Sequence, residues 1–146
     1  MNMKEKSIKF QKVLAEIIYL FLIFFFCYTA FNKLINVESF RTNLIKTSIF
    51  KSETAFYFSY LVIFLELIIV TVLLFYKNKG LLIFCFTMLI FTLYISFLRH
   101  NGLYEVCGCG GILNGLQYKY HLIINLSLIF GSLYCFLIFN KISDEK

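Results

Sequence analysis

Four apolar stretches of about twenty residues each decide what this chain can fold into. They cover approximately residues 13–31, 56–76, 80–98 and 120–139 of the 146-residue sequence. A helix needs about 20 predominantly apolar residues to cross the hydrocarbon core of a bilayer. Because 60% of the residues are hydrophobic, against about 45–50% in soluble domains, too little polar surface remains for a soluble fold. We therefore predict an all-α integral membrane protein in which residues 1–146 form a single four-helix bundle.

The distribution of Lys and Arg predicts how this bundle is oriented. Eight of these residues lie in short segments before the first stretch, between the second and third, and after the fourth: Lys4, Lys6, Lys9, Lys12, Lys77, Lys79, Lys141 and Lys146. The other six are spread over the two longer connections: Lys33, Arg41, Lys46, Lys51, Arg99 and Lys119. Cytoplasmic segments of membrane proteins carry the excess of positive charge. We therefore expect both termini in the cytoplasm and the two longer connections on the outer face.

The same topology accounts for the net charge of +6, so we expect no nucleic-acid partner. We also expect the first stretch to remain as a membrane helix, because it is too long for the apolar part of a cleaved signal peptide and no small-residue cleavage site follows it.

Residues 77–80, Lys-Asn-Lys-Gly, are predicted to form a tight turn between the second and third stretches.

The connection from Asn32 to Ala55 contains an amphipathic pattern. Apolar residues recur in it at roughly helical spacing, with charges between them: Leu34, Val37, Phe40, Leu44, Ile45 and Ile49. This pattern predicts a helix that lies in the membrane interface or dips back toward the bundle. Such a segment could serve as a lid that packs over the bundle or as a surface that binds a partner.

The last connection contains the motif Cys107-Gly108-Cys109-Gly110-Gly111. A disulfide needs Cα atoms about 4.4–6.8 Å apart, and Gly108 permits the bend that would bring the two cysteines within that range. The ring would be small, and a strained disulfide is easily reduced. The closed loop is also too short to stabilise the fold much through chain entropy. These arguments favour an exchanging dithiol, while a metal site and an incidental glycine turn remain alternatives.

Two further positions stand out because polar groups are costly inside a membrane and often functional. His121 and Asn125 lie on one face of the last stretch, a face that continues toward Ser132. A nearby imidazolium increases the thiolate fraction of a cysteine, so His121 could tune Cys107 or Cys109, or it could simply anchor the helix at the interface. Glu66 lies near the middle of the second stretch, where it could move protons, contact a quinone, or join helices through hydrogen bonds.

Three single cysteines lie inside the apolar stretches. Cys85 and Cys135 are expected to be small apolar fillers. Cys27 lies in the half of the first stretch that faces the outer side. It too is expected to be an apolar filler, although its position could let it approach the Cys107 and Cys109 pair.

Three segments together resemble the MauE branch of the DoxX-like membrane proteins. The first is residues 26–36, Phe-Cys-Tyr-Thr-Ala-Phe-Asn-Lys-Leu-Ile-Asn, which contain Lys33 and are followed by Phe40. The second is the helix that contains Glu66 and Leu67. The most specific is residues 107–113, Cys-Gly-Cys-Gly-Gly-Ile-Leu, running on to residues 121–126, His-Leu-Ile-Ile-Asn-Leu. Many relatives have Phe after the second cysteine, where this chain has Gly110.

The resemblance implies a four-helix protein of the bacterial inner membrane. Founding members are implicated in methylamine utilisation, where they support maturation of the disulfide-rich light subunit of methylamine dehydrogenase. By this resemblance we expect thiol–disulfide exchange on the outer face, with an exported protein or a thioredoxin-like protein as partner. Cys107, Cys109 and His121 would carry the exchange, and Lys33, Glu66 and Asn125 would form a supporting polar core.

The residues identify no cofactor site, although a membrane quinone is the obvious electron acceptor for such chemistry. If the protein is an enzyme, it would resemble a thiol–disulfide oxidoreductase. Two alternatives stay open. Cys107, Cys109 and His121 could hold Cu(I) as soft-metal ligands, or the protein could be a membrane scaffold without catalytic activity. The partner, the pathway and the oligomeric state do not follow from the sequence.

Overall fold

A computed structural model describes residues 3–104 and 116–144, and all regular structure in these residues is helical. The helices are α1 (Met3–Ile35), α2 (Val37–Lys46), α3 (Ser52–Phe75), α4 (Lys77–His100) and α5 (Tyr118–Asp144). Four of them are long and apolar enough to cross a membrane, over Lys6–Ile35, Ser52–Phe75, Lys77–His100 and Tyr118–Ile142. This finding confirms the predicted four-helix bundle and a multi-pass membrane protein.

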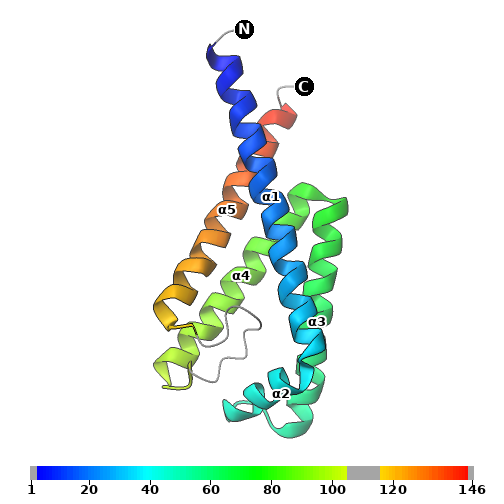
Figure 1. Cartoon of the computed structure of the whole chain (residues 1–146), viewed down its shortest axis with the longest axis vertical. Coiled ribbons are helices and arrows are strands. Elements are labelled where there is room, and N and C mark those ends of the chain that lie inside the picture. The colour runs from blue at the N-terminus through cyan, green and yellow to red at the C-terminus, as the bar shows by residue number, and fades with distance from the viewer. Residues whose placement is uncertain (1–2, 105–115, 145–146) are drawn as a thin grey trace.

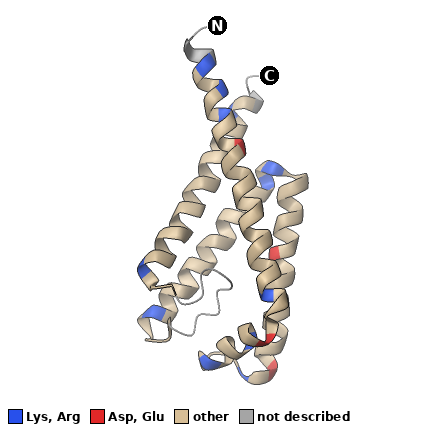
Figure 2. Ribbon diagram, viewed as in Figure 1, with Lys and Arg blue, Asp and Glu red and all other residues tan. Residues whose placement is uncertain are grey.

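The four long helices run alternately up and down, so the chain ends meet at one end of the bundle (Figure 1). The α3–α4 connection lies toward this end, whereas α2 lies at the opposite end. The chain contains no Pro, so nothing forces a kink in these helices. At 1.5 Å per residue, the 33 residues of α1 span about 50 Å, which exceeds the bilayer core of about 30 Å. Its lysine-rich start therefore projects beyond the other helices (Figure 2).

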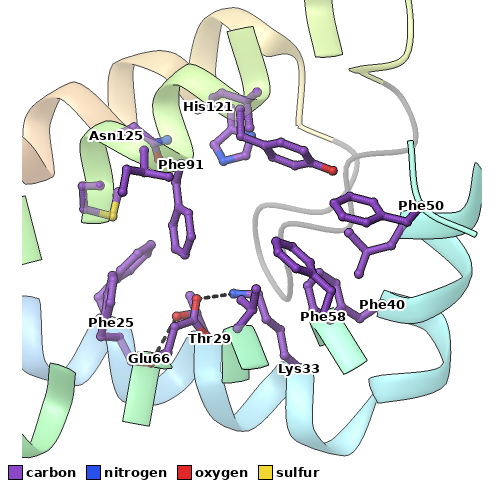
Figure 3. A pocket seen from close by; sticks show the side chains of 17 residues that line it. Phe25, Thr29, Lys33, Phe40, Phe50, Phe58, Glu66, Phe91, His121 and Asn125 are labelled. Carbon is purple, nitrogen blue, oxygen red and sulfur yellow. Dashed lines mark hydrogen bonds and ion pairs between the residues drawn. The ribbon is translucent and has the colours of Figure 1, made fainter. Parts of the chain in front are cut away.

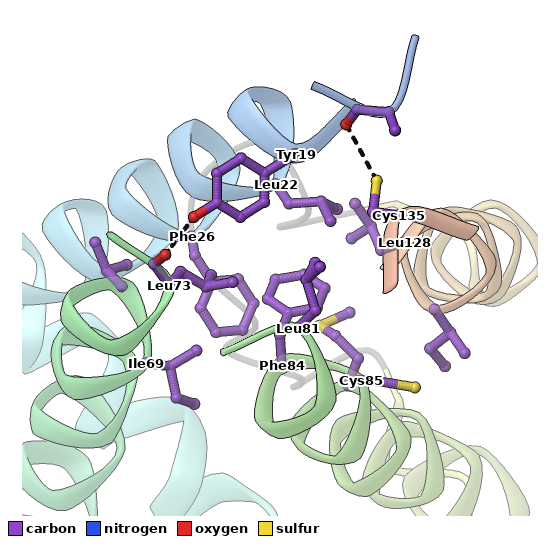
Figure 4. Close-up of a cluster of buried hydrophobic side chains, with 14 residues drawn as sticks. Tyr19, Leu22, Phe26, Ile69, Leu73, Leu81, Phe84, Cys85, Leu128 and Cys135 are labelled. Carbon is purple, nitrogen blue, oxygen red and sulfur yellow. Dashed lines mark hydrogen bonds between the residues drawn. The ribbon is translucent and has the colours of Figure 1, made fainter. Parts of the chain in front are cut away.

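The half of the bundle nearer the chain ends has an apolar core made by all four long helices (Figure 4). Phe26 of α1 packs on Phe84 of α4 with ring centroids 4.5 Å apart. Two polar atoms within this core are satisfied by backbone carbonyls across helices. The Tyr19 hydroxyl donates to the Leu73 carbonyl oxygen, and the Cys135 thiol donates to that of Ala15 at 3.2 Å. Cys135 and Cys85 are buried here, as expected for apolar fillers.

The turn between α3 and α4 differs from the prediction. Residues 77–80 do not form a turn, because they are the first turn of α4. Tyr76 alone breaks the helix, with φ −132° and ψ 75°. The tight reversal is possible because Gly80 lies against the backbone of α3, where a Cβ atom at Gly80 would lie 2.7 Å from the Cα of Leu73. Gly80 thus marks the reversal between the two helices, as expected, but it does so by allowing α4 to pack closely on α3 and not by forming a turn.

Gly80→Ala should therefore lower the free energy of unfolding by about 1–3 kcal/mol, the usual cost of overpacking. The added methyl group would meet backbone atoms of Leu73, which cannot rotate away. Gly131→Ala in α5 is the matched control, since its methyl group would meet only a side-chain carbon of Ile18, at 3.3 Å. Both substitutions gain helix propensity equally. Equal stabilities of the two variants in a detergent unfolding titration would contradict the close-packing argument.

The amphipathic segment forms the predicted helix, although α2 is limited to Val37–Lys46. Phe40 and Leu44 are buried on Ala55, whereas Ile45 and Ile49 are exposed. Leu34 belongs to α1, because α1 continues through Asn32 and ends only at Ile35. The helix α2 thus folds back onto α3 and covers one end of the bundle (Figure 1).

Candidate functional site

A buried ion pair joins α1 to α3. The Lys33 ammonium donates to the Glu66 carboxylate at 2.5 Å, from Nζ to Oε1. Both residues are buried, with 5% and 1% of their surface exposed. The sequence analysis counted Lys33 in the connection after the first stretch, whereas the structure places it inside α1 and beside Glu66, its expected neighbour in the polar core. The reason is that α1 extends past Asn32 and α2 then covers its end.

The surroundings of Lys33 are aromatic as well as acidic. The ammonium lies 5.9 Å from the ring centroid of Phe40 in α2 and 5.9 Å from that of Phe91 in α4. Rings at about 6 Å attract a cation through their electron-rich faces. The charge is thus stabilised by one carboxylate oxygen and two aromatic faces, which come from three different helices.

Glu66 has a second carboxylate oxygen, Oε2, and this atom is buried without a hydrogen-bond partner. Such an atom is costly in a low-dielectric interior. Glu66 lines a cavity of about 170 Å³ that lies among all five helices. The remaining lining is mainly aromatic and aliphatic: Phe25, Phe26, Thr29, Lys33, Phe40, Leu44, Phe50, Phe58, Val62, Met88, Ile90, Phe91, Tyr94, Ile95, His121 and Asn125.

His121 and Asn125 of α5 line the wall opposite the ion pair (Figure 3). They are buried, with 3% and 2% of their surface exposed, and Ser132 is also buried. The Asn125 amide donates to the Thr92 hydroxyl at 3.4 Å. The predicted polar face of the last helix thus points inward. His121 is a lining residue of the cavity rather than an anchor at the membrane surface.

The tautomer of His121 follows from its neighbour Tyr104. The Tyr104 hydroxyl donates its single proton to the Leu116 carbonyl oxygen at 2.8 Å. Its oxygen must then accept from the Nδ1–H of His121 at 3.1 Å, since a carbonyl oxygen cannot donate. Burial, with a smaller contribution from Tyr118, raises the pKa of Tyr104 above its ordinary value, so the hydroxyl stays protonated at neutral pH. Neutral His121 therefore carries its proton on Nδ1 and keeps Nε2 as an acceptor.

Tyr104 also joins the two chain segments that flank residues 105–115. Besides its bond to Leu116, its ring meets that of Tyr118 edge to face at 5.4 Å. The Tyr118 hydroxyl is 3.1 Å from that of Ser96. The side chains of Tyr104 and Tyr118 pack against Ile95 and Leu98 of α4. The sequence argument missed Tyr104, because nothing in its spacing distinguishes it from the other tyrosines.

The two predicted exchanging thiols, Cys107 and Cys109, lie outside the described residues. Cys27 is exposed on α1, and its predicted approach to this pair is likewise not tested. Within residues 3–104 and 116–144, no three His, Cys, Asp or Glu side chains are grouped so as to hold a metal ion. The Cu(I) alternative depends on both outlying cysteines, so it is untested as well.

The structure thus gathers Lys33, Glu66, His121 and Asn125, four of the six predicted site residues, around one cavity. The pairing of Lys33 with Glu66 and the aromatic lining were not predicted. A signal for the pair was present, because Lys33 follows Phe26 and Thr29 on the inward face of one helix. Opposite charges on inward faces of two membrane helices are expected to pair.

Comparison with known proteins gives one family. The family model described as methylamine utilisation protein MauE matches residues 11–138. This range includes α2, α3 and α4 completely, most of α1 and α5, the ion pair and the Cys-Gly-Cys motif. No curated protein and no solved structure matches the chain.

Proposed function

The chain belongs to the MauE family, and we propose that it supports thiol–disulfide exchange during maturation of an exported partner protein at the bacterial inner membrane. Cys107 and Cys109 are the exchanging pair, and His121 is the residue that tunes them. The partner is an exported substrate protein or a thioredoxin-like protein that passes disulfides to it.

The observation that carries this proposal is the contact between Tyr104 and Leu116. It holds the two flanks of the cysteine segment together at 2.8 Å, directly beside His121. Cys107 is three residues after Tyr104 in the sequence, and three residues of extended chain span at most about 11 Å. Chain connectivity thus limits how far Cys107 can lie from Tyr104, and this limit is what supports a role for His121 in the proposal.

The state of His121 suits a proton acceptor. With its proton on Nδ1, the ring can take a thiol proton on Nε2 and become an imidazolium that stabilises the thiolate. A thiolate of the partner attacks the Cys107–Cys109 disulfide, so that one S–S bond forms and one breaks, and the departing cysteine sulfur leaves as a thiolate. A second attack, by another thiolate of the partner on the mixed disulfide, releases the partner. The partner thereby gains one disulfide, and Cys107 and Cys109 become a dithiol.

The charge distribution supports an outer location for the motif. With Lys33 buried in an ion pair, five basic residues remain at the α2 end of the bundle: Arg41, Lys46, Lys51, Arg99 and Lys119. By sequence, eight belong to the segments near the termini and the α3–α4 connection. The difference in the number of basic residues between the two ends is larger than the sequence alone indicated. It favours an orientation with both termini in the cytoplasm. The motif would then face the compartment in which disulfides persist.

The redox state of Cys107 and Cys109 in intact membranes tests the proposal. Cells are acid-quenched, free thiols are blocked with one mass-tagged maleimide, and the reduced remainder is labelled with a second. We expect a Cys107–Cys109 disulfide or a mixed disulfide with another protein. The exposed Cys27 and the buried Cys85 and Cys135 serve as internal references for labelling.

Other outcomes would contradict thiol exchange. Two reduced thiols that resist the first maleimide until a chelator is added would favour the Cu(I) alternative. Two reduced thiols that react with the first maleimide without a chelator would leave a scaffold without redox chemistry. Any captured partner can be identified from the mixed disulfide by mass spectrometry.

A further inference from the structure

We propose that the cavity among the five helices binds the ring of a lipid-soluble quinone and its quinol, with Glu66 Oε2 accepting a hydroxyl hydrogen bond from the quinol. The inference rests on the proposed function in one respect: it names the chemical class that receives the electrons of the dithiol. The binding site itself consists of described residues and can be tested without the cysteines.

The size and lining of the cavity fit one aromatic ring. A cavity of about 150 Å³ in an apolar protein core is known to bind benzene, and this one has about 170 Å³. Seven aromatic rings from α1, α2, α3, α4 and the segment between α2 and α3 line it, including Phe25, Phe91 and Tyr94. Aromatic side chains favour edge-to-face and offset-stacked contacts with another ring. The shape and apolarity of the site therefore select a flat, lipophilic molecule.

The polar groups of the cavity select among lipophilic molecules. Glu66 Oε2 is buried and unpaired, so a ligand that donates a hydrogen bond there removes an energetic cost. His121 Nε2 is a second acceptor, and it belongs to the wall opposite Glu66 (Figure 3). The two hydroxyl groups of a quinol point in opposite directions from one ring and can serve both acceptors. An acyl chain would satisfy neither.

The oxidised form has its own partner in the site. A quinone carries only acceptors, and the Lys33 ammonium has three N–H donors, of which Glu66 Oε1 uses one. The site can thus bind both forms, but the unpaired carboxylate oxygen favours the quinol. This preference drives reduction of the ring by the protein.

The ligand has a route from the bilayer. Two lining residues, Phe58 of α3 and Ile90 of α4, are 37% and 48% exposed. Both are apolar and belong to membrane-spanning helices, so the proposed route from the bilayer passes these two residues. A ligand dissolved in the membrane enters there without crossing water.

The electrons and protons of the proposed reaction balance. Two thiols of the exchanging pair give two electrons and two protons to one quinone, which forms one disulfide and one quinol. No other reductant or oxidant is required. The quinol then leaves by the route through which the quinone entered.

Calorimetric titration of the full chain in nanodiscs, with empty nanodiscs subtracted, tests the site using decylubiquinol and decylubiquinone as probes. We expect saturable binding of both, tighter for the quinol. Glu66→Gln removes the negative charge and leaves a neutral amide oxygen as the weaker acceptor, so it should weaken quinol binding at least about tenfold, as expected for a hydrogen bond to a charged group. Quinone binding should change less than about threefold, because the carboxylate oxygen offers the quinone no donor.

Two variants keep this test decisive. Glu53→Gln is the matched control, because Glu53 is an exposed residue in the first turn of the same helix, and it should bind like the unmodified chain. Glu66→Gln leaves Lys33 without its counter-ion, so Lys33→Met with Glu66→Leu is added as a variant that folds without charges. It should lose the preference for quinol. Equal quinol affinity in all variants would overturn the proposal.

Competition identifies other occupants and separates the two proposals. Displacement of the quinol by a decyl chain without a ring would show a lipid-chain cavity and overturn the inference. Quinol binding by a Cys107→Ser/Cys109→Ser variant should match that of the unmodified chain. If quinol binds there but no cysteine disulfide forms in membranes, the site stands and the proposed function fails. If the disulfide forms but neither probe binds, the function stands and this inference fails.

Discussion

Lys33→Met should lower the free energy of unfolding by about 3–5 kcal/mol, the usual cost of removing one partner of a buried ion pair. The loss arises because Glu66 would remain as an uncompensated charge, 1% exposed and near the middle of α3. The Coulomb attraction to Lys33 at 2.5 Å is what permits a carboxylate at that depth. Unfolding in mixed detergent micelles, followed by circular dichroism, measures the difference.

The double variant Lys33→Met/Glu66→Leu should recover most of this loss. Replacing a buried ion pair by well-packed apolar residues is often neutral or stabilising, and the cavity around the pair is already lined by Phe40 and Phe91. Lys79→Met is the surface control, since Lys79 is exposed and should change stability little. If the double variant is as unstable as Lys33→Met alone, the pair is not the source of the loss.

Hydropathy was sufficient to predict the fold class, for a physical reason. In a bilayer every backbone polar group must be satisfied within the segment, so long apolar stretches have to be helices. Four such helices can be arranged in a membrane in only a few ways. The ends of the helices were less predictable, because nothing in the residue pattern distinguishes a lysine at the bilayer surface from one that continues inward.

Lys33 illustrates this limit. A lysine after about twenty apolar residues is normally a flanking charge, and the sequence argument counted it as one. Two further facts decide otherwise: α1 ends only at Ile35, and α2 folds back over it through Phe40 and Leu44. The end of α1 and the position of α2 both depend on how the helices pack together, which the residue pattern near Lys33 does not show. By contrast, the inward face of His121 and Asn125 was predictable, since polar groups four residues apart in a membrane helix must avoid lipid.

The cavity could not be predicted at all. Its lining residues come from five helices and from the segment before Ser52, and no spacing rule places Phe25 beside Phe91 or Glu66 across from His121. Phe occurs 19 times in the chain, so aromatic content alone does not single out the rings that line a site. That Oε2 of Glu66 has no partner likewise depends on the tertiary packing, in which Lys33 reaches only Oε1.

Cys107→Ser and Cys109→Ser should each reduce disulfide formation in the partner to the level of cells that lack the protein. A hydroxyl cannot form the S–S bond through which exchange proceeds, so either substitution stops the cycle completely. The two variants should differ in one respect. The one that retains the sulfur attacked by the partner should accumulate a mixed disulfide, because its thiolate can attack a disulfide of the partner in the reverse reaction and the resolving thiol is missing.

Cys27→Ser is the matched control for the cysteine variants, since it makes the same atomic change at an exposed position on α1. It should leave exchange unchanged, and all three variants should unfold at the same detergent fraction as the unmodified protein. Retention of full exchange by both Cys107→Ser and Cys109→Ser would exclude the redox function. Loss of exchange in Cys27→Ser as well would place a third thiol in the cycle and require the pair to be assigned anew. The identity of the trapped cysteine then establishes which sulfur the partner attacks, because only that sulfur is bonded to the partner.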